Sequence, residues 1–142
     1  MARLALAPLS EVVIGAAIRV HKALGPGLLE SAYDQCLAYE LTSRDIRFQH
    51  QMALPVNYRG VQIACGYRVD YLIEGRLLVE LKASECLQPI HFAQTLTYLR
   101  RLGLHRGLII NFNVCRLVDG VKSVVNGKPD DRAEGDHGDT EV

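Results

Sequence analysis

Three ionic side chains lie close together in the middle of the chain, within a stretch that is otherwise apolar. Glu80 and Lys82 belong to the segment "LLVELKA", and Asp70 belongs to the preceding segment "YRVDYLI". Side chains alternate along a β-strand, so Glu80 and Lys82 point to one face while Val79 and Leu81 point to the other. A carboxylate and an ammonium on one face of an apolar strand indicate either a site or a solvated surface.

The register of the predicted hairpin decides whether Asp70 joins this pair. If residues 74–76 form a three-residue connection, Asp70 lies directly opposite Glu80, and the two carboxylates share a face with β-carbons about 5 Å apart. With a two-residue loop, Asp70 would pair with Val79 and point away. The first register predicts a site made of two carboxylates and a lysine.

Two carboxylates at that separation repel each other and stay ionised most easily with a cation between them. Paired oxygen ligands suit Mg²⁺ or Mn²⁺ better than zinc. The Lys82 ammonium could hold an attacking water or stabilise charge on a phosphate, which is the chemistry of phosphodiester hydrolysis. The alternative is the solvated face of an antiparallel sheet, but the apolar flanks and Gln94 on the following helix favour a site.

The elements that must position these residues follow from the periodicity of the apolar side chains. With Ser10 as its N-cap, a first amphipathic helix runs to Leu24 and ends at the Gly-Pro-Gly of residues 25–27. A second helix is expected over about 28–44. Alternation from Phe48 to Leu54 then predicts a strand, and "NYRG" is typical of a turn.

The second half of the chain alternates between strands and a helix. "YRVDYLI" and "LLVELKA" predict an antiparallel hairpin, and a helix begins at Pro89 and is closed by Gly103. "RGLIINF" is typical of a central strand, and "RLVDGVKSVV" suggests a weaker hairpin around Asp119 and Gly120. The order of two helices, three antiparallel strands, a helix and a strand predicts a layered α/β domain.

Composition predicts one domain over residues 1–127 and a disordered acidic tail over residues 128–142. The tail holds two bases and six acids, a net charge of −4, and the other 14 bases and 10 acids give residues 1–127 a charge of +4. This mildly basic body permits a polyanionic partner such as nucleic acid. Exposed cations that could contact a phosphate backbone are Lys22, Arg68, Arg100, Arg101 and Arg106.

Other features of the composition favour a cytoplasmic protein with reduced thiols. No apolar run approaches the roughly 20 residues that a membrane span needs, and the N-terminal segment is interrupted too early for a signal peptide. The four cysteines never occur as a close pair, so a metal–thiolate site is not expected.

Residues near the break between the first two helices are further candidates. Glu30 lies in the first turn of the second helix, where the helix dipole stabilises a carboxylate, and Tyr33 shares its face. His21 precedes the break, and a capping or partly buried histidine is favoured there over a catalytic one.

The order of Asp70, Glu80 and Lys82 resembles the signature of the PD-(D/E)XK nucleases. A longer pattern is more specific: "GPGLLESAYDQCLAYEL" contains Gly27-x-x-Glu30-x-x-Tyr33 and is followed by "GYRVDYLI", "VELKA", "AQTLTYLR" and "GLIINFNV". Over residues 10–125 the chain is similar to the GxxExxY family, a branch of that superfamily. The residue before Asp70 is Val69 where the signature has a proline, at a position that varies in the superfamily.

This resemblance implies a restriction-endonuclease-like core, a mixed β-sheet flanked by helices with a divalent metal ion at one end of the sheet. It implies that Asp70, Glu80 and the backbone carbonyl of Leu81 ligate Mg²⁺ or Mn²⁺, and that Lys82 acts on the attacking water. Carried over in the same way, Glu30 supports the metal site or the lysine, and Gln94 orients Lys82 or a water.

Two functions are therefore weighed for this chain. The first is a metal-dependent nuclease that hydrolyses phosphodiester bonds of DNA or RNA, with a homodimer left open. The second is a non-catalytic module of the same fold that binds nucleic acid or a protein. A binding module has no use for carboxylates that repel phosphate, which favours the nuclease.

Overall fold

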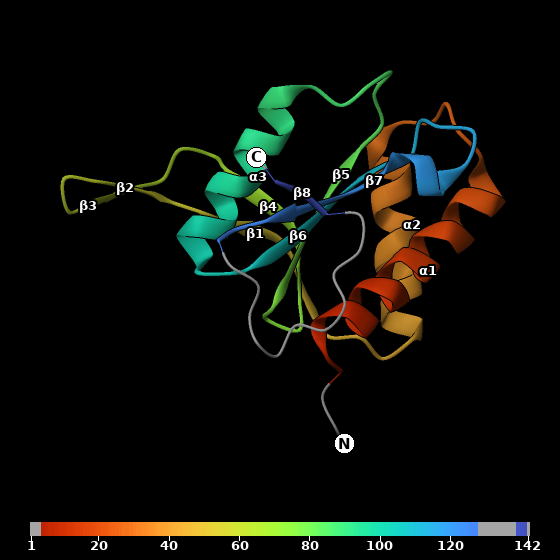
Figure 1. Cartoon of the computed structure of the whole chain (residues 1–142), viewed down its shortest axis with the longest axis horizontal. Helices are drawn as coiled ribbons and strands as arrows, with labels where there is room; N and C mark the ends of the chain where they lie inside the picture. Colours follow the sequence, from red (N-terminus) through yellow and green to blue (C-terminus); the bar gives the residue numbers. More distant parts are fainter. Residues whose placement is uncertain (1–3, 128–138, 142) are drawn as a thin grey trace.

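The structure, a computed structural model, describes residues 4–127 and 139–141 (Figure 1). Its elements are α1 (Leu6–Leu24), α2 (Glu30–Ser43), β1 (Phe48–Ala53), β2 (Val56–Tyr58), β3 (Val61–Ile63), β4 (Arg68–Ile73), β5 (Leu77–Lys82), α3 (Pro89–Leu102), β6 (Arg106–Asn111), the 3₁₀-helix η1 (Leu117–Gly120), β7 (Val121–Val125) and β8 (Asp139–Glu141). No helix in this part of the chain is both long and apolar enough to cross a membrane.

One mixed sheet forms the centre of the molecule. Its strands follow the order β1-β4-β5-β6-β7-β8, and the pairs β5–β6 and β7–β8 are parallel while the others are antiparallel. β2 and β3 pair only with each other and form a separate hairpin, which extends away from the body of the molecule (Figure 1). The predicted mixed sheet flanked by helices is confirmed.

Helices cover the two faces of this sheet. On one face, α1 and α2 pack through Val13, Ala17 and Leu37 onto strand residues that include Val79 and Leu81. On the other face, α3 packs through its apolar side onto Leu78, Ile109 and Val124. In Figure 1 the sheet accordingly runs between the α1–α2 pair and α3. Every residue of β6 is buried, as expected for a central strand with helices on both sides.

The predicted N-cap of the first helix is wrong. α1 begins at Leu6, and Ser10 lies inside the helix, where its buried hydroxyl donates to the carbonyl of Leu6 at 3.0 Å. The helix extends further because Leu6 and Leu9 bury their side chains in the core. α3 follows the prediction: Pro89 is its first residue, and Gly103 ends it in the left-handed conformation with φ 67°.

The predicted turn at "NYRG" is confirmed, because Arg59 and Gly60 connect the short paired strands Val56–Tyr58 and Val61–Ile63. The prediction of a hairpin around Asp119 and Gly120 is wrong. No hairpin is centred on Asp119 and Gly120: Leu117–Gly120 is η1, and β7 pairs back onto β6. The backbone of Gly120 lies so close to β6 that a β-carbon there would be 2.1 Å from the Asn111 carbonyl oxygen.

The predicted disordered tail falls mainly outside the described residues, which exclude 128–138 and 142. Three residues of that tail, Asp139–Glu141, form β8 and pair in parallel with β7, and for the rest of the tail disorder stays a prediction. A strand at the edge of a sheet offers unpaired backbone groups to any extended segment, which explains this addition.

Replacing Gly120 by alanine should destabilise the fold, because the new methyl group would overlap the main chain of β6. We expect the free energy of unfolding to fall by about 3 kcal/mol, the upper end of the usual cost of overpacking. The matched control is Gly15→Ala, since Gly15 is an exposed position of α1 with open space around it. That change should raise stability by up to about 1 kcal/mol. Urea unfolding of both variants measures the difference, and equal effects would contradict this packing.

Candidate active site

The β4–β5 hairpin has the register that the site requires. Ile73 pairs with Leu77 and Tyr71 pairs with Val79, so residues 74–76 form the predicted three-residue connection. Glu74 and Gly75 both have positive φ, at 53° and 68°. Continued by one step, this register sets Asp70 opposite Glu80. The predicted three-residue connection is confirmed.

Asp70 and Glu80 bond to each other's strands where the regular ladder between β4 and β5 ends. The backbone N–H of Asp70 donates to Oε2 of Glu80 at 2.9 Å, and the backbone N–H of Leu81 donates to Oδ2 of Asp70 at 2.8 Å. Side-chain carboxylates thus take the place of main-chain carbonyls as acceptors. This exchange joins the two carboxyl groups across the hairpin.

Each carboxylate accepts from the main chain of the neighbouring strand, whereas the sequence predicted that both side chains point to one face of the sheet. Val69 and Tyr71 pack into opposite core clusters, so the usual alternation is interrupted at Asp70. β1 has an irregular residue at the same level: Gln51 has φ 55°, and its amide donates to Oδ1 of Asp70 at 3.3 Å. Asp70 is therefore fixed from both neighbouring strands.

Glu80 is buried and carries a strongly perturbed carboxyl group. Only 8% of the residue is exposed. The pKa of Glu80 is raised to about 9, first by burial and then by the negative charge of Asp70, while the charge of Lys82 acts in the opposite direction. Near neutral pH the pair of carboxyl groups therefore retains a proton that a bound cation would displace.

Glu30 and Lys82 complete one electrostatic cluster with these two carboxyl groups. The pKa of Glu30 is raised, first by partial burial of its carboxyl group and then by the charge of Asp70, while Lys82 lowers it. The residue as a whole is exposed to solvent at the start of α2. In Figure 1, α2, whose first residue is Glu30, begins at the same end of the molecule where β5 ends with Lys82. The structure thus brings Glu30, Asp70, Glu80 and Lys82 together.

The two carboxylates could hold an ion of the magnesium type, which needs few protein ligands. They would not suffice for a metal ion whose ligands are all side chains. Within residues 4–127 and 139–141, no three His, Cys, Asp or Glu side chains are close enough to hold a metal ion together. Mg²⁺ is commonly held by only one or two carboxylates and keeps several waters. The Leu81 carbonyl could add a ligand, because its N–H points to Asp70 and the two polar groups of a strand residue point the same way.

Tyr33 fixes the loop that carries Glu30. Its buried hydroxyl donates to the carbonyl of Gly25 at 2.6 Å and accepts from the N–H of Leu28 at 3.1 Å. The ring stacks on Phe112 with centroids 4.5 Å apart. Gly27 has φ 95°, a conformation suited to glycine, which lets the chain turn into α2. The Gly27, Glu30 and Tyr33 spacing is therefore a structural unit that places one carboxylate.

The segment after Lys82 is tied to β6. The N–H of Phe112 donates to the Lys82 carbonyl at 2.9 Å. The Asn111 amide accepts from the N–H of Ser84 at 3.2 Å and donates to its carbonyl at 3.0 Å. These bonds fix the backbone at Lys82 and directly after it.

Gln94 lies on α3 and donates to the hydroxyl of Tyr98 at 2.8 Å. Its orientation of Lys82 or a water stays a prediction. Tyr98 is buried, and its pKa is raised by that burial first and then by the charge of Glu80, which indicates that α3 faces the carboxylate pair.

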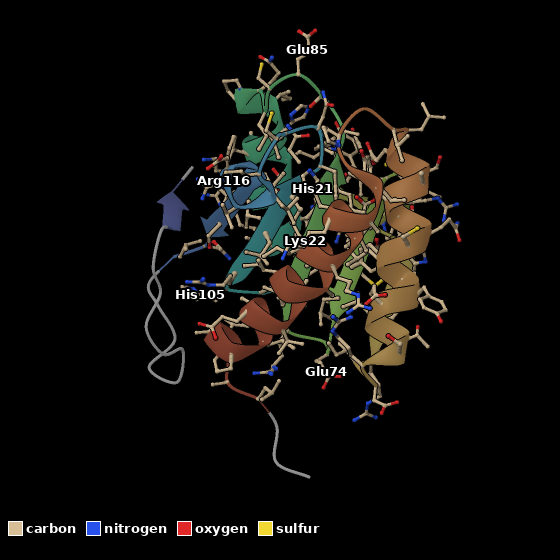
Figure 2. The ribbon with its side chains drawn as sticks, turned by 90° about the vertical axis from the view of Figure 1, so that its right-hand side faces the viewer. His21, Lys22, Glu74, Glu85, His105 and Arg116 are labelled. Atoms are coloured by element: carbon tan, nitrogen blue, oxygen red, sulfur yellow. The ribbon has the colours of Figure 1, made fainter. Side chains whose placement is uncertain are left out.

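The other predicted residues have varied surroundings. His21 is buried on α1 and bonds through Nε2 to the Val114 carbonyl at 2.8 Å, so it supports the loop after β6 (Figure 2). Lys22 is exposed on the same helix, and Arg68, Arg100 and Arg101 are exposed on β4 and α3. Arg106 is only 4% exposed, so its prediction as a phosphate contact is wrong. It begins a strand whose every residue is buried.

Two residues that sequence reasoning missed lie beside the site. The pKa of His91 is lowered, first by burial and then by the charge of Lys82. Its Nδ1 accepts from the N–H of Gln88 at 3.0 Å in a capping box. Tyr98 is the second, and its spacing of four residues from Gln94 on a predicted helix was the available signal.

Replacing Glu80 by glutamine should make the metal-free protein more stable than wild type at alkaline pH. The pKa of Glu80 is raised from 4.5 in the unfolded chain to about 9, so its contribution to stability is present at low pH and is lost as the pH rises through this range. Glutamine keeps an acceptor for the Asp70 N–H but carries no charge. Urea unfolding should show similar stabilities near pH 4.5, and a relative advantage of the variant that grows toward pH 9. A constant difference across this range would contradict the raised pKa.

Comparison with known families identifies the superfamily of the chain. A family model described as the PD-(D/E)XK nuclease superfamily matches residues 7–124, and comparisons with curated proteins and with solved structures found no significant match. The matched range includes the whole cluster of Glu30, Asp70, Glu80 and Lys82. The chain therefore belongs to the PD-(D/E)XK nuclease superfamily.

Proposed function

We propose that this protein is a metal-dependent nuclease that hydrolyses phosphodiester bonds of nucleic acid. The observation that carries the proposal is the Asp70–Glu80 pair, two carboxyl groups joined across a hairpin with one of them buried. Burial of mutually repelling carboxyl groups is costly, and a divalent cation between them would offset that cost. Nucleases of this superfamily generally use such ions.

The residues around the pair have distinct roles in this proposal. Asp70, Glu80 and the Leu81 carbonyl hold Mg²⁺ or Mn²⁺, which when bound supplies Lewis-acid stabilisation of charge on the phosphate. Lys82 holds and orients the attacking water beside them. Gln94 helps to orient that water or Lys82.

Glu30 supports the lysine from α2. Its carboxyl group responds to the charges of both Asp70 and Lys82, so it lies near enough to keep the ammonium on the side of the metal ligands. The rigid unit of Gly27, Glu30 and Tyr33 also supports assignment of the chain to the GxxExxY branch of the superfamily. The protein would act in the cytoplasm.

The basic body of the protein supports a nucleic acid partner. Residues 1–127 carry a formal charge of +4, and Lys22, Arg68, Arg100 and Arg101 are exposed. Cations of this kind position a phosphate backbone without reading its sequence. The competing function, a non-catalytic binding module, would retain binding without metal-dependent turnover.

Replacing Lys82 by alanine should reduce cleavage of a mixed pool of DNA and RNA oligonucleotides by about 100-fold or more in Mg²⁺ or Mn²⁺, since loss of one electrostatic stabiliser commonly costs that much. Mn²⁺ binding measured by calorimetry should be retained. Asp70→Asn should instead weaken Mn²⁺ binding by about tenfold or more as well as cleavage.

The matched control is Lys122→Ala, which removes an exposed lysine from β7 and should leave both measurements unchanged. Unchanged Mn²⁺ affinity in Asp70→Asn would contradict the proposed ligand set. Binding of oligonucleotides with no turnover in either metal would favour the binding module.

Replacing Tyr33 by phenylalanine should lower kcat about tenfold with little change in KM. The variant removes the hydroxyl that bonds Gly25 and Leu28, so the loop before Glu30 loses its fixed position. Stability should also fall by about 1 kcal/mol. If Tyr33 acts through Glu30, the double variant with Tyr33→Phe and Glu30→Gln should have a kcat little lower than that of the more impaired single variant.

The control for this prediction is Tyr39→Phe, which changes an exposed tyrosine of the same helix. Fully additive losses in Tyr33→Phe and Glu30→Gln would show that the two residues act independently, and would contradict the positioning role.

A further inference from the structure

A cavity of about 480 Å³ lies between α3 and the base of the β2–β3 hairpin. Its walls are mainly apolar or aromatic and include Leu54, Pro55, Tyr67, Ile90 and Tyr98. Both its size and this lining are typical of sites that bind small organic groups. Two of its lining residues, Gln94 and Arg101, have roles in the proposed function, but the cavity itself has not been assigned a ligand.

A few polar groups converge on the same cavity. Gln94 and Arg101 line it from α3, and the Gln94 amide is held by its bond to the hydroxyl of Tyr98. Tyr67 and Tyr98 form an edge-to-face pair with centroids 6.4 Å apart. Together they offer aromatic surface for stacking and an amide for hydrogen bonding, which is the combination that recognises an unpaired base.

The cavity adjoins the carboxylate cluster. Tyr98 lines it and belongs to the same packed core cluster as Val69, the residue directly before Asp70. Tyr67 precedes Asp70 by only three residues. A ligand in the cavity would therefore lie beside the position where a phosphate meets the proposed metal ligands.

The charge around the cavity suits a polyanion. Residues 51–69, which include the β2–β3 hairpin, contain no Asp or Glu, and neither do residues 86–118, which include α3. The same two segments expose Arg59, Arg68, Arg100 and Arg101. Positive charge on both walls favours a strand of nucleic acid that runs past the cavity.

We propose that this cavity binds one unstacked base of the substrate, next to the phosphodiester that is cleaved. The inference rests on the proposed nuclease function and narrows its substrate class to single-stranded or locally unpaired nucleic acid. A base inside a duplex is stacked and paired, so it cannot enter the cavity without being extruded. Tyr67 and Tyr98 supply the stacking surface, Gln94 bonds the edge of the base, and Arg101 contacts the backbone.

The β2–β3 hairpin would extend this interaction along the strand. Tyr58 is exposed on the hairpin, as are Val61 and Ile63. An isolated two-stranded hairpin is marginally stable in water, and contact with a bound strand would stabilise it. A second copy of the chain on this surface is the competing occupant.

Binding can be tested without turnover. Fluorescence anisotropy in EDTA would compare a labelled 12-nucleotide single strand with a duplex of the same sequence, using DNA and RNA forms of each. We expect the single strand to bind at least about tenfold more tightly, since stacking of one base is worth roughly that factor or more. Equal affinity for the duplex, or no binding of any of these probes, would overturn the proposal.

Two variants locate the binding site. Ala93→Phe adds a ring to an exposed wall of the cavity without removing a contact, and Tyr67→Ala removes stacking surface. Both should lower affinity for the single strand about tenfold. The matched controls are Ala23→Phe on α1 and Tyr39→Ala on α2, which change exposed residues of the opposite helical layer. Undiminished binding by Ala93→Phe would overturn the site even if Tyr67→Ala fails to fold.

The anisotropy measurement in EDTA separates the proposed base-binding cavity from the proposed nuclease function. Because EDTA removes the metal ion, a protein that lacks nuclease activity can still show the preference for single strands, and an active nuclease can still lack it. Light scattering of the metal-free protein tests whether a second copy of the chain occupies the cavity instead. A stable dimer that Ala93→Phe dissociates would assign the cavity to a second copy and overturn the base site.

Discussion

The reciprocal hydrogen bonds of Asp70 and Glu80 are the interaction on which the proposed chemistry depends. Each carboxylate accepts from the main chain of the other residue's strand, at 2.8 and 2.9 Å, where the ladder between β4 and β5 ends. The arrangement concentrates negative charge in a buried place, and the pKa of Glu80 is raised to about 9, first by burial and then by the charge of Asp70. In the proposed function, a bound divalent cation would offset this concentrated negative charge.

The surrounding elements keep this pair in position from three directions. β1 contributes the Gln51 amide to Asp70, and the bonds of Asn111 and Phe112 fix the backbone around Lys82. On the third side, Tyr33 fixes the loop that precedes Glu30. A cluster assembled from β4, β5 and α2 can therefore be held to the precision that catalysis requires.

Much of this arrangement could be predicted from the sequence because it rests on local patterns. Residues 74–76 set the hairpin register, and Pro89 and Gly103 bound α3, so Asp70, Glu80 and Gln94 could be assigned to their elements. The alternation rule failed at Asp70, because the irregular Gln51 on β1 is a tertiary partner that no local pattern indicates. The cavity was missed for the same reason, since Tyr67 and Ile90 come from segments far apart in the chain. Arg106 was placed on the surface because its burial depends on the packing of a central strand.

The most direct test of the central claim is crystallography of the protein soaked with Mn²⁺, using the anomalous signal of manganese to locate the ion. The account predicts one strong peak between the carboxylates of Asp70 and Glu80, at about 2.1 to 2.2 Å from an oxygen of each and beside the Leu81 carbonyl. A peak at another site, or none at a Mn²⁺ concentration that supports cleavage, would contradict it.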